Sequence, residues 1–232
     1  VYLYSSNSGI NIYKIQVDSS ASSGSGSSSS GSSTTDTSNG TVVTSFSELT
    51  AAVTKAEKAG GGIVYVKGSS ISCTAQLALK ASNANVSIIG VKNSDGTYPV
   101  LDFSAFRSAY IGKATTDSEV GIRISGSKYT IKNLIIQKAP DNGIQIKGSS
   151  AGNNTIENCI VRYNNDAGVQ ITGGAYSNTM RFVYSYRNCD VYTLGGNADG
   201  FAPKLGAGKG NVFYGCYSWE NSDDGWDSYD KD

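Results

Sequence analysis

The stretch that decides the fold is "NTIENCIVRYN", which runs from Asn154 to Asn164. It aligns without gaps with "NTMRFVYSYRN" at 178–188 and "NVFYGCYSWEN" at 211–221, and the starts of the three copies lie 24 and 33 residues apart. An earlier copy is visible in "YTIKNLIIQKA", where Thr130 matches Thr155. Each copy is followed by a short segment opened by glycine: "GIQIKG" at 143, "GVQITG" at 168, "GFAPKLG" at 200 and "GWDSYD" at 225. These segments read as second strands.

Repeats of about 20–30 residues, with two or three short strands broken by Asn and Gly, are typical of a parallel β-helix, a solenoid whose coils lie ~4.8 Å apart. Equivalent positions of such repeats stack on one another. Two apolar files face the interior in this alignment: Ile131, Ile156, Met180 and Phe213 in one, and Leu134, Cys159, Val183 and Cys216 in the other. We therefore predict an all-β solenoid.

One helix is expected, at the N-terminal end of the repeats. In "SFSELTAAVTKAEKAGGG", Ser45 or Ser47 is a candidate N-cap and Gly60 a stop signal, and apolar residues recur at helical spacing. The helix runs directly into the strand "IVYVKG". We expect it to cap one end of the β structure.

The chain divides into three parts. Residues 1–17 alternate like the C-terminal end of a preceding β module, and residues 18–40 are almost purely Ser, Gly and Thr, which predicts a flexible linker, or else the remnant of an engineered fusion. The β-helix domain spans residues 41–232. It is expected to be a C-terminally truncated domain.

Composition excludes several classes of function. The 19 basic and 19 acidic residues cancel, so neither nucleic acid nor an anionic membrane is an expected partner. No apolar run approaches a membrane span, and the absence of histidine removes the commonest general base and zinc ligand. The cysteines have no paired spacing, and we interpret Cys73, Cys159, Cys189 and Cys216 as buried thiols in a monomer.

A candidate site comes from acids near the C-terminal end, in "ENSDDGWDSYDKD" at 220–232. Aligning the turns that follow the repeats puts Asp199 and Asp224 in one column, with Asp223 beside it. Asp227 shares an outward column with Gln145, Gln170 and Ala202. Two adjacent coils thus bring together four carboxylates: Asp199, Asp223, Asp224 and Asp227.

Carboxylates this close repel, by about 3 kcal/mol for a pair ~5 Å apart at an effective dielectric near 20, so a cation is expected among them. Calcium fits best, because it accepts 6–8 hard oxygen ligands in irregular geometry. The spacing is not that of an EF-hand, since Gly225 directly follows the acid pair. The alternative is a solvated acidic turn without a metal.

The segment "NADGFAPKLGAGKGNVFYGCYSWENSDDGWDSYDK" at 197–231 strongly resembles polysaccharide lyase family 9, the pectate lyases built as right-handed parallel β-helices. In general pattern the likeness covers residues 41–232. It implies Ca²⁺ on Asp199, Asp223, Asp224 and Asp227, and cleavage of polygalacturonate, the pectin backbone, by β-elimination. A secreted, extracellular enzyme is expected.

The resemblance is incomplete in one respect, because no residue here matches the family's catalytic lysine. We expect that base beyond Asp232, which would leave this fragment inactive or nearly so. Lys204 alternates outward beside Asp227 and is a candidate for gripping a substrate carboxylate, the alternative being a structural ion pair with the aspartates. Two other functions stay open: a polygalacturonase-like hydrolase using Asp223 and Asp224, and a non-catalytic, calcium-stabilised β-helix that binds polysaccharide.

Overall fold

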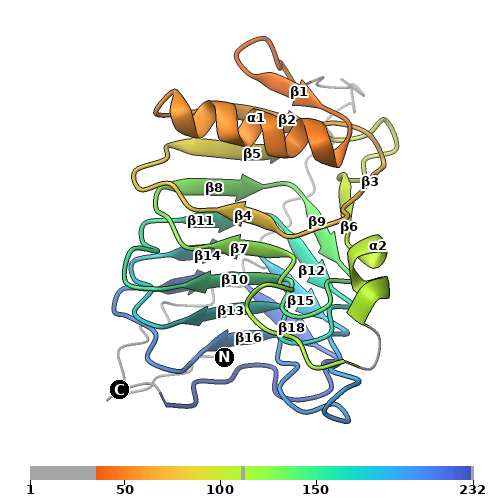
Figure 1. Ribbon diagram of the computed structural model, residues 1–232, viewed down its shortest axis with the longest axis vertical. Helices are drawn as coiled ribbons and strands as arrows, with labels where there is room; N and C mark the ends of the chain where they lie inside the picture. Colours follow the sequence, from red (N-terminus) through yellow and green to blue (C-terminus); the bar gives the residue numbers. More distant parts are fainter. Residues whose placement is uncertain (1–34, 111–112, 231–232) are drawn as a thin grey trace, which may run out of the picture.

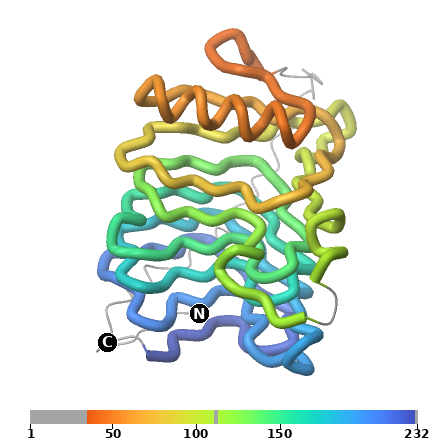
Figure 2. Tube along the Cα trace, viewed as in Figure 1, coloured from red at the N-terminus to blue at the C-terminus, as the bar shows by residue number. Residues whose placement is uncertain are grey.

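The computed structural model describes residues 35–110 and 113–230. The chain winds as a spiral in which each full coil contributes one short strand to each of three parallel sheets (Figure 1). Figure 2 shows the same spiral as a continuous trace that descends coil by coil from the N-terminal helix. The predicted all-β, right-handed parallel β-helix is confirmed.

The strands of each sheet follow one another along the axis. The first sheet contains β1 (Thr41–Val43), β2 (Gly62–Val66), β5 (Val86–Gly90), β8 (Tyr129–Lys132), β11 (Thr155–Glu157), β14 (Thr179–Arg181) and β17 (Val212–Tyr214). The second contains β3 (Ser70–Ser72), β6 (Val100–Asp102), β9 (Ile135–Gln137), β12 (Ile160–Arg162), β15 (Tyr184–Tyr186) and β18 (Tyr217–Trp219). The third contains β4 (Leu77–Leu79), β7 (Ile122–Ile124), β10 (Ile144–Lys147), β13 (Val169–Thr172) and β16 (Phe201–Pro203).

The register is the one that the repeats predicted. Ile156 pairs with Ile131 on one side and with Met180 on the other, and Met180 pairs in turn with Phe213. The first three are fully buried, so this file lies in the core. In the second predicted file Leu134, Cys159 and Val183 are also buried. Similar residues of successive coils thus stack on one another, and each coil builds the core by contacting only the coils next to it.

Helix α1 (Phe46–Lys58) lies across the N-terminal end of the spiral, as expected (Figure 1). The Ser45 side chain caps it by accepting a hydrogen bond from the Glu48 N–H. The helix buries the four apolar residues that recur at helical spacing: Leu49, Ala52, Val53 and Ala56. This face covers the open end of the core. Two further short helices were not predicted: α2 (Ser104–Arg107) and η1 (Ser108–Tyr110).

Two ladders of asparagine side chains run along the spiral, which the sequence analysis missed. Asn178 Oδ1 accepts from both the backbone N–H and the Nδ2 of Asn154, and the same pattern joins Asn178 to Asn211. The second ladder is made in the same way by Asn164, Asn188 and Asn221. The first and last residues of the three repeats that begin at Asn154, Asn178 and Asn211 are therefore the ladder residues. They satisfy backbone donors at the corners, where no strand partner is available.

The corners between strands are made by single residues with positive φ at equivalent places of successive coils. Between the first and second sheets these are Asn133, Asn158, Phe182 and Gly215. Asparagine and glycine tolerate this conformation, whereas Phe182 adopts it with φ 53° at a steric cost. The corner geometry is thus repeated even where the residue type changes.

Some expectations were wrong or lie outside the described residues. The segment "GWDSYD" forms only an isolated bridge, between Trp226 and Phe201, rather than a strand. The four cysteines are free, and Cys73 and Cys159 are buried as predicted, but Cys216 is only half-buried. Cys189 is exposed, because it stands at the start of the longer connection after β15. Residues 1–17 and most of the 18–40 linker are outside the described ranges. Within those ranges, no helix is long and apolar enough to cross a membrane.

Candidate metal and substrate site

The candidate site lies where the chain passes from the second sheet to the third. Gly168 donates its N–H to Asp199 O at 2.8 Å, and Gly200 donates to Asp224 O at 2.9 Å, so Asp199 and Asp224 occupy equivalent positions of adjacent coils. The Asp224 N–H also donates to Asp199 Oδ1 at 3.3 Å. Carboxylate oxygens of Asp199, Asp223 and Asp224 all lie within 4.8 Å of one another. Asp199 is fully buried, and the other two acids are exposed.

The longer connection between β15 and β16 helps to hold this cluster. The Asp190 carboxylate accepts from the backbone N–H groups of Tyr192 and Thr193, which folds the connection into a compact turn. Further along it, the Asn197 N–H donates to Asp223 Oδ2 at 2.8 Å. The nine-residue lengthening that distinguishes this coil is therefore in contact with the predicted ligands. The contact was missed because it uses a main-chain donor.

Asp227 lies outside the group of three and joins it through Lys204. The Lys204 ammonium donates to Asp199 Oδ2 at 2.8 Å and to Asp227 Oδ2 at 2.7 Å. Lys204 is 7% exposed, so this is a largely buried charge network rather than a surface pair. Of the two roles considered for Lys204, the ion pair with the aspartates is present. A role in gripping substrate stays a prediction.

The electrostatics of the site reflect an excess of acid. Burial raises the pKa of Asp199, and the Lys204 hydrogen bond only partly opposes this. Burial alone would lower the pKa of Lys204, but its hydrogen bonds with Asp199 and Asp227 outweigh burial and raise the pKa. Lys204 is therefore a protonated ammonium. Nearby, burial and the charge of Asp141 raise the pKa of Asp166 to about 7.

The donor set fits a hard divalent cation. It offers carboxylate oxygens from two coils, one of them completely buried. Lys204 balances the charge of Asp199, but among the described residues Asp223 and Asp224 form no ion pair, so the cluster keeps an excess of negative charge. Oxygen-only ligands in irregular geometry suit calcium better than zinc or iron, which favour nitrogen and sulfur. The stacking thus assembles three of the four predicted ligands, with the fourth bound to the neighbouring ammonium.

Fold and site together define a parallel β-helix protein with a candidate cation site on its outer surface. The family model of the Pel9A-like right-handed β-helix region matches residues 30–232, and the chain belongs to this family. It is 34% identical over 192 residues to pectate lyase L of Paenibacillus polymyxa, covering 79% of this chain and 40% of the relative. It is 66% identical over 35 residues to pectate lyase L of Thermoclostridium stercorarium, covering 15% of this chain and 3% of the relative.

A solved structure shows the same likeness. The crystal structure of pectate lyase Pel9A matches with a TM-score of 0.59 at 29% identity, covering 73% of this chain and 42% of that one. The chain thus spans roughly two fifths of the length of the Paenibacillus relative and of the Pel9A structure. The resemblance to family 9 lyases read from the sequence is confirmed at the level of the family.

Proposed function

We propose that this chain is the calcium-binding portion of a secreted pectate lyase that cleaves polygalacturonate by β-elimination. The observation that carries the proposal is the convergence of Asp199, Asp223 and Asp224 from adjacent coils, in a chain whose relatives are named pectate lyases. Asp227 would complete the ligand set by exchanging its contact with Lys204 for the ion.

Calcium held there would neutralise a uronate carboxylate and so stabilise the negative charge that develops when the neighbouring carbon loses its proton. The residues of this chain hold and orient that assembly. Asp199 is fixed by the Asp224 N–H and by Lys204. Asp223 is fixed by the Asn197 N–H.

Lys204 is a positioning residue in this proposal. Its ammonium is bound to two carboxylates and carries a raised pKa, and a group in that state is a poor acceptor of a proton. The base is expected to be a different lysine, as the family resemblance implies. Lys204 would instead neutralise Asp199 and Asp227 and hold both carboxylates in place until calcium binds.

Two measurements test the proposal. Calorimetric titration of this chain with calcium should show binding that is lost in Asp199→Asn. Incubation of the longer protein with polygalacturonate should release unsaturated, ultraviolet-absorbing ends and stop on addition of a chelator. Saturated reducing ends would instead identify a hydrolase, and calcium-dependent binding without turnover would identify a non-catalytic β-helix.

A further inference from the structure

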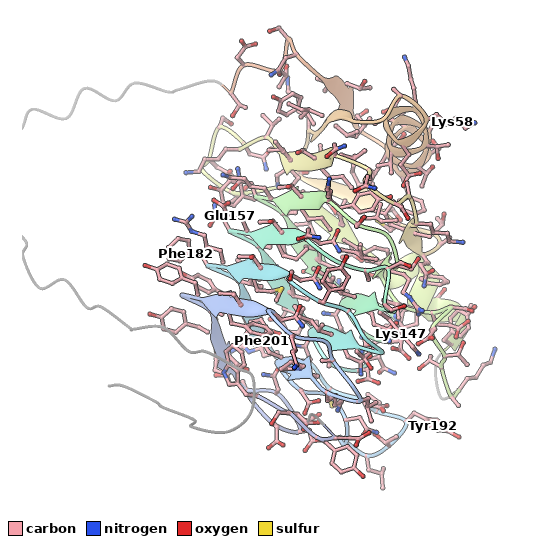
Figure 3. All side chains as sticks on the ribbon, turned by 90° about the vertical axis from the view of Figure 1, so that its left-hand side faces the viewer. Lys58, Lys147, Glu157, Phe182, Tyr192 and Phe201 are labelled. Atoms are coloured by element: carbon pink, nitrogen blue, oxygen red, sulfur yellow. The ribbon has the colours of Figure 1, made fainter. Side chains whose placement is uncertain are left out.

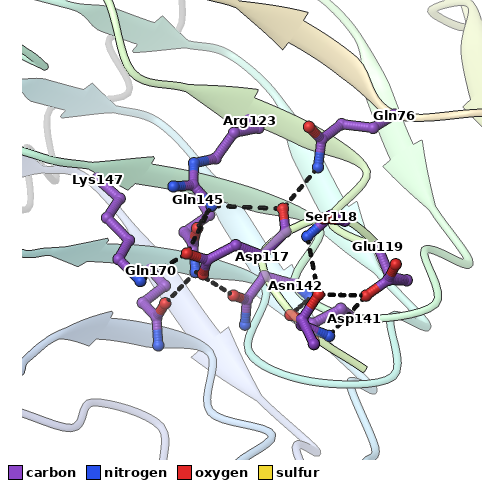
Figure 4. A network of polar contacts seen from close by, with 11 residues as sticks. Gln76, Asp117, Ser118, Glu119, Arg123, Asp141, Asn142, Gln145, Lys147 and Gln170 are labelled. Carbon is purple, nitrogen blue, oxygen red and sulfur yellow. Dashed lines mark hydrogen bonds and ion pairs between the residues drawn. The ribbon is translucent and has the colours of Figure 1, made fainter. Parts of the chain in front are cut away.

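A second charged cluster lies on the outer face of the third sheet, around β7 and β10 (Figure 4). Asp117, from the connection before β7, places one carboxylate oxygen 2.6 Å from Lys147 Nζ and 3.2 Å from an Arg123 guanidinium nitrogen. Its other oxygen accepts from Gln145 Nε2 at 3.2 Å. One carboxylate is thus held by a guanidinium, an ammonium and an amide.

Hydrogen bonds between side chains on neighbouring strands of the third sheet hold the cluster in place. Arg123 NH1 donates to Gln145 Oε1 at 2.6 Å, and Gln145 Nε2 donates to Gln170 Oε1 at 2.6 Å. Arg123 and Gln145 are register partners on β7 and β10, so the ladder fixes their backbone positions, and the hydrogen bond to Gln145 holds the guanidinium independently of the Asp117 carboxylate. The Arg123 guanidinium would therefore keep its contact with Gln145 if that carboxylate left. Among the described residues the Lys147 ammonium pairs with Asp117, so it would become free to bind another carboxylate.

Asp117 itself is replaceable. Its side chain is 42% exposed and that of Lys147 is 39% exposed, so water and solutes reach the contact. Exposed ion pairs of this kind contribute little to folding. Among the described residues, two donors in the cluster also have no acceptor: Arg123 Nε and the Nδ2 of Asn142, a residue that is 1% exposed. The cluster therefore holds more donors than Asp117 satisfies.

Two other acids lie nearby, and each has its own partners. The Glu119 carboxylate accepts from the Thr116 N–H and hydroxyl, both at 2.7 Å. Asp141 is 7% exposed and accepts from the Asn142 N–H. Asp117 is the acid in direct contact with both cations.

The cluster shares a face with the candidate metal site. Lys147 pairs with Thr172 on β13, and Lys204 follows Pro203, the partner of Ile171, so Lys147 and Lys204 flank Thr172 in one column. Two coil steps separate them, or roughly 10 Å at the usual strand spacing. An extended acidic polysaccharide that is bound at the aspartates and runs parallel to the solenoid axis would pass over Lys147.

We propose that Arg123, Gln145 and Lys147 form a subsite for a uronate carboxylate of the substrate, and that Asp117 occupies this subsite as an internal competitor. The proposal rests on the proposed function for its substrate class. A uronate carboxylate offers the same two oxygens as Asp117 and forms the same charge-assisted hydrogen bonds. Binding would exchange one carboxylate for another.

The test is calorimetric titration of this chain with hexagalacturonate in excess chelator, which removes any contribution of calcium. Arg123→Gln and Lys147→Gln should each weaken binding by about tenfold, because each removes a charge-assisted contact. Asp117→Asn should strengthen binding by about threefold, because the competing charge is gone. A purely structural role for Asp117 predicts the opposite sign or no change.

Matched controls come from the Lys132–Glu157 pair, at 3.0 Å with side chains 38% and 27% exposed. Figure 3 shows Glu157 and Lys147 on opposite sides of the solenoid. Lys132→Gln and Glu157→Gln should leave the affinity within about twofold. The fully methyl-esterified hexamer, which lacks the carboxylates, should bind Asp117→Asn no better than the unaltered chain.

The proposal is overturned if Asp117→Asn binds no more tightly while its circular dichroism and melting temperature match the unaltered chain. It is also overturned if Arg123→Gln and Lys147→Gln bind as well as the controls do, a result that does not depend on how Asp117→Asn folds. Absence of any hexagalacturonate binding overturns the subsite too. The proposed function is judged separately, by calcium titration and product analysis.

Discussion

Lys204 donates a hydrogen bond to the buried carboxylate of Asp199 at 2.8 Å, and the same ammonium reaches Asp227 at 2.7 Å. One side chain thus provides the counter-charge for two acids from adjacent coils. A cation entering the cluster has to share these carboxylates with Lys204 or take them over.

Lys204→Gln should destabilise the calcium-free chain by about 3–5 kcal/mol, because it leaves the fully buried Asp199 carboxylate without a counter-charge. Calcium should restore much of this loss, so the stabilisation by calcium should be larger in the variant than in the unaltered chain. Urea unfolding with and without calcium measures both quantities. Lys209→Gln, at an exposed lysine, is the control. An equal gain from calcium in both proteins would contradict the shared-carboxylate arrangement.

Asp199→Asn should weaken calcium binding by more than about tenfold, because it removes the buried ligand that the other two acids surround. Titration calorimetry at fixed ionic strength gives the affinity. The matched control is Asp95→Asn, whose carboxylate is engaged within its own exposed turn by Thr97. Unchanged affinity in Asp199→Asn would show that the ion, if bound, lies elsewhere.

Asn178→Ala should cost about 2–4 kcal/mol of folding free energy. Asn178 is fully buried, and its loss leaves both the backbone N–H and the Nδ2 of Asn154 without their acceptor. Asn93→Ala removes a half-buried asparagine whose side chain bonds locally to Thr97 and should cost much less. Denaturant unfolding compares the two. Similar losses would mean that the ladder contributes little to stability.

Asp166→Asn should stabilise the protein at alkaline pH. Burial, together with the charge of Asp141, raises the pKa of Asp166 to about 7, above the ordinary value of 3.8. The folded state therefore binds this proton more tightly than the unfolded chain, and Asp166 weakens stability as pH rises from about 4 to about 7.

The advantage of the asparagine variant should grow across that interval and level off above it, reaching about 1–3 kcal/mol. Thermal or urea unfolding at pH 4.5, 6 and 8 follows the trend. Asp95→Asn serves again as the exposed control. An advantage of Asp166→Asn that is constant with pH would be inconsistent with a raised pKa.

The coil register was predictable because it depends on residues of one chemical type at fixed positions. Ile156 could be placed over Ile131 and under Met180 from the sequence alone, since a slip would put polar residues into the core. The same alignment places Asp199 next to Asp224, and in the structure the Asp224 N–H donates to Asp199 Oδ1. The repeat architecture of the domain and its acid cluster could thus both be predicted from the sequence.

Contacts that depend on irregular segments could not be predicted from the sequence. The pairing of Asp117 with Lys147 spans 30 residues and depends on how one connection folds back over the sheet. Asn154 reads as an ordinary turn residue, because its ladder role appears only when the coils are stacked. Trp226 opens a segment with the pattern of a strand but forms a single bridge. Local pattern could not reveal these features.

The acid cluster also has a mechanical consequence. Its carboxylates belong to adjacent coils of the solenoid, so an ion bound by Asp199, Asp223 and Asp224 would cross-link those coils at a fixed spacing. Mechanical unfolding of the solenoid along its axis would have to break that cross-link before the next coil could unfold. In a force–extension measurement that pulls on these coils, bound calcium would then appear as a separate step in the extension of the chain.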